Sequence, residues 1–193
     1  MKVPLVAPNP YWKLYYQKEA SRIAAALQQY QLAATIEHIG STSIPIIAKP
    51  TIDILIGLSP NMLLDDCIAA FAKLGYIYVS KYNEALPMRR FFIKIKSKSL
   101  LEKRLQKEIA KADEMPPRQS FERLFHVHIV HKESLFFRQH LAFRNHIRAN
   151  EYDRTLYQEL KQHLSQQDWE VENDYAQAKA GFIEDILNKI AAR

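Results

Sequence analysis

The sequence predicts an α+β fold, in which a mixed β-sheet flanked by helices is followed by a helical C-terminal third. Three patterns support this prediction. Thr51–Leu58 is β-branched and aliphatic except for one aspartate, which is typical of a central strand buried on both faces. Arg89–Lys96 and Leu124–His131 alternate along the chain as strands do. From about residue 134 onward, apolar residues recur at helical spacing.

The N-terminal part is expected to contain one helix and one short strand before the buried run. The helix spans Tyr11–Tyr30, with Asn9 as its cap and Pro10 in its first turn. The strand spans Thr35–Ile39 and is broken by the polar turn Gly40–Ser43. This turn therefore leads from the short strand toward the central one.

The middle of the chain is expected to mix helices and strands before the chain becomes helical. Asn61–Leu74 is predicted to be a helix that ends at Gly75, and Tyr76–Ser80 a short strand. A charged, amphipathic helix is expected over Lys98–Asp113, because its apolar residues recur four apart. The C-terminal helices are expected at Ser134–Asn150, Glu151–Leu164 and Asn173–Ala192.

Composition and charge narrow the class of protein. The chain has 193 residues, 48% of them hydrophobic, which is enough for one domain with its own core. No apolar run is long enough to span a bilayer and no signal-peptide pattern is present, so no membrane partner is expected. Cys67 is the only cysteine, which excludes an intrachain disulfide and favours the cytoplasm. The net charge of +6 favours anionic partners such as nucleotides, phosphorylated metabolites or RNA, or else reflects a solvated basic exterior.

Asp53 is the residue that the predicted fold leaves without an explanation. It is the only charge in the run Thr51–Leu58. Burying a carboxylate is costly unless it is paired, hydrogen-bonded or bound to a metal. Asp53 is therefore expected to have a partner elsewhere in the fold.

The motifs of the chain resemble those of the GrpB family, a branch of the nucleotidyltransferase-like superfamily. The resemblance spans about residues 10–190 and implies a nucleotidyltransferase-like sheet in a single domain over residues 1–193. The segment of about residues 97–121 is longer than the family leads us to expect, and we interpret it as a helical, mobile insertion at the periphery. The resembling motifs are His38–Pro45, Ala48–Ile54, Arg89–Phe92, His126–Val130, Phe143–Arg148 and Tyr157–Lys161.

The superfamily resemblance implies a phosphate site beside a metal site. Backbone amides and hydroxyls of a Gly-Ser turn hold phosphate oxygens, here those of Gly40, Ser41, Thr42 and Ser43. Carboxylates on the next strand hold divalent metal, such as Mg²⁺ or Mn²⁺, beside the phosphate. Asp53 matches the first acid, but Leu55 stands where the second acid falls, so one face of this strand offers a single carboxylate.

Two histidines offer a substitute for the missing acid. His126 and His128 are two apart on a predicted strand, so their rings share one face. If that strand neighbours the strand of Asp53, the three side chains would form a metal site that suits Mn²⁺, Zn²⁺ or Fe²⁺ better than Mg²⁺. Alternatively, the histidines bind phosphate, transfer protons, or are packed and inert.

Lys49 and Arg90 are the cationic candidates for holding phosphate and stabilising developing charge. The alternative is a surface charge or an ion pair with Asp53. Lys94 and Lys96 share the predicted strand face of Arg90, which favours the functional role. The arginines of the next helix, Arg138, Arg144 and Arg148, are interpreted as solvated or paired rather than as part of a basic groove.

Three functional hypotheses remain open. The first is a metal-dependent nucleotidyltransferase or phosphoryl-transfer enzyme with a small phosphorylated or nucleotide substrate, in which Asp53, Ser41, Lys49 and Arg90 are the catalytic residues. The second is a module that has kept the fold and lost catalysis, and that binds a nucleotide, a coenzyme A-like molecule or RNA. RNA is the weaker choice, because the sequence has no RNA-binding motif and no arginine-rich tail. The third is an interaction domain whose basic face docks on an acidic protein.

Overall fold

A computed structural model describes residues 2–98, 106–117, 119–170 and 172–192, which form a five-stranded mixed sheet. The strand order is β1-β2-β5-β4-β3. β2 and β5 are parallel, and the other neighbours are antiparallel. The predicted α+β class is therefore confirmed. The strands are β1 (Ala34–Ile39), β2 (Ile52–Leu58), β3 (Ile77–Tyr78), β4 (Arg90–Ser97) and β5 (Phe121–His131).

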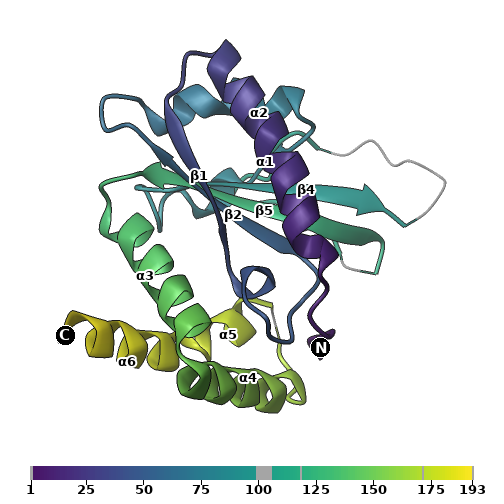
Figure 1. The fold of residues 1–193 in the computed structure, drawn as a ribbon. Coiled ribbons are helices and arrows are strands. Elements are labelled where there is room, and N and C mark those ends of the chain that lie inside the picture. Colours follow the sequence, from purple (N-terminus) through teal and green to yellow (C-terminus); the bar gives the residue numbers. More distant parts are fainter. Residues whose placement is uncertain (1, 99–105, 118, 171, 193) are drawn as a thin grey trace.

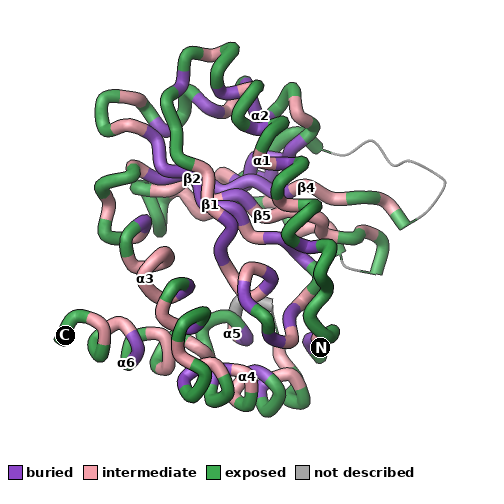
Figure 2. Tube along the Cα trace, in the orientation of Figure 1, coloured by how far each residue is buried: buried purple, intermediate pink, exposed green. Residues whose placement is uncertain are grey.

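Helices cover the sheet on both faces, with the helical C-terminal third below it in the view of Figure 1. The central strand β2 is buried along nearly its whole length, and its neighbour β5 is buried toward its C-terminal end (Figure 2). Among the described residues, no helix is long and apolar enough to cross a membrane. The helices are α1 (Tyr11–Gln29), α2 (Ile68–Lys73), α3 (Leu135–Ala149), α4 (Glu151–Ser165), α5 (Glu172–Gln177) and α6 (Ala180–Ala191), with short 3₁₀ turns η1 (Ser41–Ser43), η2 (Leu64–Cys67) and η3 (Ser80–Tyr82).

The face of the sheet under α1 and α2 carries the main apolar core and one buried ion network. Glu19 of α1 is 5% exposed and accepts hydrogen bonds from Lys94 Nζ at 2.7 Å and from the Tyr76 hydroxyl at 3.0 Å. Lys94 thus neutralises a carboxylate inside the fold. Lys94 therefore does not support a functional role for Arg90, which the alternation of this strand had favoured.

The opposite face carries two apolar clusters with polar side chains between them. One cluster, which includes Leu55 and Val130, packs under Phe137 of α3. The other, which includes Phe91 and Ile93, packs under Ile109. Asp53, His126 and His128 lie on this same face, because they are in register with Ile93, Leu55 and Phe91 in the rows that cross the sheet. The polar row is therefore held in place from both sides.

The segment between β4 and β5 differs from its prediction. The helix expected over Lys98–Asp113 is wrong for residues 106–113, which contain no helix, and residues 99–105 lie outside the described residues. Instead, Glu108 bridges to Tyr78 of the edge strand β3. Ile109 is 1% exposed, and its amide donates to the Tyr78 carbonyl at 2.8 Å. This described part is packed against the sheet edge, not set apart from it.

The C-terminal helices begin at predictable caps and are tied together by one buried carboxylate. Ser134 Oγ accepts from the Phe137 amide, and Asn150 Oδ1 accepts from the Asp153 amide. Asp153 of α4 is 3% exposed and binds His146 Nε2 of α3 at 2.6 Å and Lys189 Nζ of α6 at 2.7 Å. Three helices are thereby fixed relative to one another.

The packing of α3 on the sheet depends on the absence of a side chain at Gly57. A Cβ there would lie 2.7 Å from a Phe137 ring carbon and 2.8 Å from Lys132 Cβ. We expect Gly57→Ala to lower the free energy of unfolding by about 1–3 kcal/mol, because these neighbours must move. Chemical denaturation measures this. Gly181→Ala is the control, because no atom lies within 4 Å of its Cβ and the change favours helix α6, adding up to about 1 kcal/mol. Equal effects at the two sites would contradict the packing described.

Candidate functional site

The turn after β1 and the carboxylate on β2 are in direct contact. Gly40 has φ +66° and ψ −174°, a backbone conformation that is essentially restricted to glycine. The last residue of β1, Ile39, is paired with Asp53. A Cβ on Gly40 would lie 2.3 Å from Asp53 Oδ2, so the carboxylate lies against the backbone of the turn. The structure thus brings Gly40, Ser41 and Asp53 together.

His126 is the partner that the Asp53 carboxylate requires. Parallel pairing of β2 with β5 places the two residues side by side, with His126 Nδ1 3.3 Å from Asp53 Oδ1. Burial raises the pKa of Asp53, but the hydrogen bond from His126 and the nearby positive charge, including that of Lys49, outweigh burial and lower the pKa below its ordinary value. Asp53 is therefore ionised at neutral pH, and since a carboxylate only accepts hydrogen bonds, His126 donates through Nδ1.

His128 lies two residues beyond His126 on β5, on the same face of the sheet, and its ring is neutral. Burial, followed by the charge of Arg89, holds its pKa well below the ordinary range. Its Nδ1 lies 3.2 Å from Arg89 Nη1 and accepts that hydrogen bond, because a guanidinium only donates. Phe91 stacks on the ring with centroids 4.9 Å apart. Arg89 and the half-buried His140 of α3, whose pKa is also lowered by desolvation, extend the polar row beyond His128.

The three predicted metal ligands, Asp53, His126 and His128, lie on one face of the neighbouring strands β2 and β5. In the described part of the chain, no three His, Cys, Asp or Glu side chains are grouped so that they could hold a metal ion. The Asp53 carboxylate is engaged by His126, and one ring nitrogen of His128 is engaged by Arg89. The metal site predicted from Asp53, His126 and His128 therefore stays a prediction.

Helix α4 binds the segment that joins the turn to β2. Burial raises the pKa of Tyr157, although the side chain of Ser41 lies near enough to the Tyr157 hydroxyl to favour its ionised form. Gln158 Oε1 accepts from the Ile47 amide at 3.2 Å, and Lys161 Nζ donates to the Ile47 carbonyl. The C-terminal third thus holds the Gly-Ser turn and its connection in place, as the nearness of α4 to this loop in Figure 1 illustrates.

Three lysines from different segments lie near one another, and two of them, Lys49 and Lys161, lie within electrostatic reach of Asp53. Lys49 Nζ and Lys179 Nζ lie 5.2 Å and 4.1 Å from the centroid of the Tyr175 ring. Lys161 is 2% exposed, and burial together with the charges of Lys179 and Lys49 lowers its pKa to about 7, although the charge of Asp53 opposes this. This group, defined here as the lysine cluster (Lys49, Lys161 and Lys179), places positive charge beside the turn and the carboxylate.

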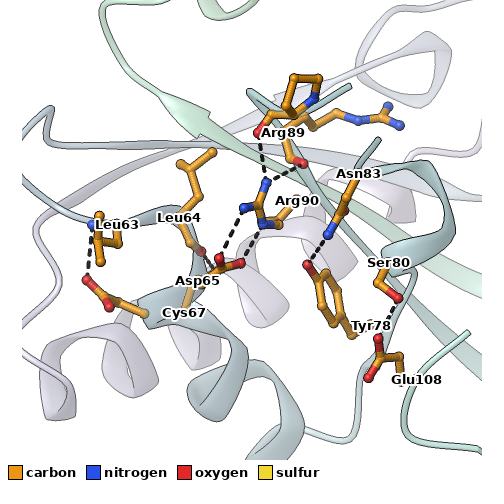
Figure 3. Close-up of polar contacts among 12 residues, drawn as sticks. Leu63, Leu64, Asp65, Cys67, Tyr78, Ser80, Asn83, Arg89, Arg90 and Glu108 are labelled. Atoms are coloured by element: carbon orange, nitrogen blue, oxygen red, sulfur yellow. Dashed lines mark hydrogen bonds and ion pairs between the residues drawn. The ribbon is translucent and has the colours of Figure 1, made fainter. Parts of the chain in front are cut away.

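Arg90 is not brought to this site. It is in register with Ile129, on the opposite face of the sheet from Asp53. Its guanidinium binds both carboxylate oxygens of Asp65, at 2.5 Å and 3.1 Å, while the side chain of Arg89 extends away from this pair (Figure 3). Arg89, and not Arg90 as predicted, therefore lies on the same face of the sheet as Asp53 and His128.

Thr42 and His38 face α1 rather than Asp53. His38 is in register with Ile54, its Nε2 lies 3.1 Å from Thr42 Oγ1, and its ring stacks on Tyr16 with centroids 4.6 Å apart. Burial, followed by the charges of Arg148 and Arg144, lowers the pKa of His38 to about 4 although the charge of Asp53 raises it. Of the turn residues predicted to hold phosphate, Thr42 is thus committed to a buried contact.

The low pKa of His38 predicts a loss of stability in acid. The ordinary pKa is 6.5 and the folded value is about 4, so between these values the unfolded chain binds the extra proton and protonation favours unfolding. We expect His38 to contribute a loss of up to roughly 3 kcal/mol as pH falls through this window. His38→Gln should flatten the pH dependence of unfolding, measured by urea denaturation. His163→Gln, on an exposed position of α4, should leave the pH dependence unchanged.

Sequence reasoning proposed the turn, Asp53, Lys49 and the two histidines as site residues, and it gave no role to the C-terminal helices that the structure places around them. Tyr157 and Lys161 belong to a motif that was recognised without a role. They are four apart on α4 and are therefore neighbours on the helix surface, which was the signal that the sequence offered. Lys179 and Tyr175 carry no local pattern that connects them to the turn.

The mixed five-stranded sheet, with a Gly-Ser turn after one strand and an aspartate on the next, defines a nucleotidyltransferase-like fold. A family model described as GrpB protein matches residues 2–189, and the chain belongs to the GrpB family. The chain is 29% identical over 182 residues to a UPF0157 protein of Streptomyces coelicolor, with 94% of this chain and 80% of that protein covered. It is 25% identical over 191 residues to the glutamate-rich protein GrpB of Alkalihalophilus pseudofirmus, with 98% and 96% covered.

A solved structure gives the same result for the whole fold. The crystal structure of conserved protein GrpB from Enterococcus faecalis matches with a TM-score of 0.71 at 28% sequence identity. The match covers 97% of this chain and 96% of that chain. Both the sheet and the helical C-terminal third therefore lie within the matched region.

Proposed function

We propose that the protein binds a small phosphorylated molecule of the nucleotide class beside the Gly40–Ser43 turn, and that lysines rather than a resident metal balance the charge of its phosphates. The observation that carries this proposal is the lysine cluster, in which Lys49 and Lys161 lie within electrostatic reach of Asp53. Cations in a site with few water contacts bind phosphate oxygens strongly. The cytoplasm, with its phosphorylated metabolites, remains the expected location.

Lys161 has the properties of a group that responds to an anion. Its pKa of about 7 reflects burial and two neighbouring positive charges, all of which disfavour the ammonium form. An arriving phosphate would offset the neighbouring charges and favour protonation. Tyr157, whose hydroxyl lies near the Ser41 side chain, would fix the turn at the same time.

Metal-dependent nucleotidyl or phosphoryl transfer is the second candidate. It is favoured by Asp53, which stays ionised and lies against the turn. One aspartate together with substrate phosphates would hold Mg²⁺ or Mn²⁺ weakly, since Mg²⁺ keeps several waters and takes few protein ligands. Such a metal would supply charge neutralisation at the transferred phosphate, while Asp53 and Lys49 would orient it.

Calorimetry with ATP, coenzyme A and pyrophosphate, in EDTA or in excess Mg²⁺, separates the two candidates. We expect binding in EDTA that Lys161→Met weakens by about tenfold or more, the loss of one charge-assisted contact. Lys111→Met is the control, because Lys111 is exposed and pairs with Glu84 at the surface. Binding that requires metal and is lost in Asp53→Asn would establish the second candidate instead. Binding of none of the three probes would overturn both.

Binding in EDTA is also expected to take up protons. The free protein holds Lys161 mostly neutral at about pH 8, and the phosphate raises its pKa, so roughly half a proton or more should be absorbed per ligand. Titration calorimetry in two buffers of different ionisation enthalpy measures the uptake. Lys161→Met should remove it in any residual binding, whereas proton release by the native protein would contradict the role of Lys161.

A further inference from the structure

A separate groove of about 410 Å³ runs along the outer edge of the sheet, where β1 is the edge strand. It is lined by residues of α1, β1, η1 and α3, and Asp53 and the lysine cluster do not line it. Its volume falls within the range of small-molecule sites, about 300–1,000 Å³. We refer to it as the edge groove; the lining residues that matter here are Lys13, Tyr16, Glu37, Thr42, Arg144 and Arg148.

The floor of the edge groove is closed to another β-strand. Tyr16 donates its hydroxyl to the Ile36 carbonyl at 3.0 Å, and Arg144 Nη1 donates to the His38 carbonyl at 2.9 Å. These carbonyls are the outward acceptors of the edge strand, which an added strand would need. The groove is therefore suited to a small molecule and not to a peptide that extends the sheet.

The edge groove carries more positive than negative charge. Its one carboxylate, Glu37, is bound by Arg144 Nη1 at 2.7 Å. Lys13 and Arg148 have no carboxylate partner among the described residues. Arg148 Nε instead donates to the Ser43 carbonyl at 2.9 Å. Burial, followed by the nearby charge of Arg144, lowers the pKa of Arg148, and the opposing charge of Glu37 does not restore it.

From this arrangement we infer that the edge groove is a second anion site, which binds the phosphate group of a small molecule between Lys13 on α1 and Arg148 on α3. The guanidinium offers the fixed donor geometry that suits phosphate, and Lys13 adds a point charge from the opposite wall. A phosphate here would relieve the repulsion between Arg144 and Arg148. It would also link α1, the η1 turn and α3 through one ligand.

The test is titration of the full-length protein with inorganic phosphate at constant ionic strength, followed by ¹⁵N–¹H NMR. We expect saturable shifts at the amides of Gln17 and Arg148, with a dissociation constant that Lys13→Glu raises at least about fivefold, as loss of a phosphate contact predicts. Lys18→Glu makes the same charge change on an exposed position of α1 outside the groove and should raise it less than about twofold.

Variants of the two sites distinguish the two proposals. Lys161→Met should leave phosphate binding in the edge groove unchanged while it weakens binding beside the Gly40–Ser43 turn. The inference is overturned if the shifts do not saturate, if they are confined to Lys49 and Lys161, or if Lys18→Glu weakens binding as much as Lys13→Glu.

Discussion

Replacing Gly40 by alanine is expected to lower the free energy of unfolding by about 2–5 kcal/mol and to abolish ligand binding beside the turn. The backbone of Gly40 lies in a region that costs other residues about 1–3 kcal/mol. The added Cβ would also meet Asp53 Oδ2 at 2.3 Å and its Cγ at 2.9 Å. Because β2 is paired with β1 on one edge and with β5 on the other, the carboxylate has to move rather than the strand.

Gly75→Ala separates the backbone cost from the clash. Gly75 also has a positive φ, of +78°, but no atom lies within 4 Å of its Cβ, so about 1 kcal/mol is expected there. Asp53→Ala combined with Gly40→Ala should be less destabilised than the sum of the single variants, because the clashing atoms are gone. Chemical denaturation of the native protein, Gly40→Ala, Asp53→Ala and the double variant gives the coupling free energy. Additive effects would show that Asp53 does not press on the turn.

The strands of the sheet could be predicted because their patterns are local. Thr51–Leu58 is apolar enough to be central, and the pairing of β2 with β5 put Asp53 beside His126 as the sequence suggested. The alternation of β4 also separated Arg90 from Phe91 correctly. The alternation along a strand does not show which face of the sheet carries the site. α1 and η2 cover the face of Arg90, and their carboxylates Glu19 and Asp65 neutralise its cations.

The segment before β5 shows why a helical pattern misleads. Apolar residues four apart in Lys98–Asp113 fit an amphipathic helix, but Ile109 is also one apolar residue among polar ones, as in an edge strand. Its pairing with Tyr78, some thirty residues away along the chain, decides the outcome for the described residues. Contacts between distant segments also explain the lysine cluster, which joins a loop after the turn to α4 and to the start of α6.

Replacing Lys161 by methionine is expected to stabilise the protein at neutral pH while it weakens ligand binding. The unfolded chain binds the Lys161 proton up to its ordinary pKa of 10.5, whereas the folded protein releases it at about 7, so burying this lysine costs several kcal/mol at about pH 7. Methionine has a similar length and needs no solvation. It leaves the Ile47 carbonyl without the Lys161 donor, which costs about 1–3 kcal/mol and limits the gain.

The pH dependence identifies the cause of this effect. Above the folded pKa of about 7 the unfolded state still holds a proton that the folded state has lost, so the stability contributed by Lys161 rises with pH. From about pH 7.5 to about pH 9 the native protein should gain roughly 2 kcal/mol relative to Lys161→Met, at about 1.4 kcal/mol per pH unit. Lys111→Met should instead follow the native profile, since it removes an exposed side chain. A constant difference between native and Lys161→Met proteins would mean that Lys161 is charged when buried. Its positive charge would then be balanced by Asp53 before any ligand arrives.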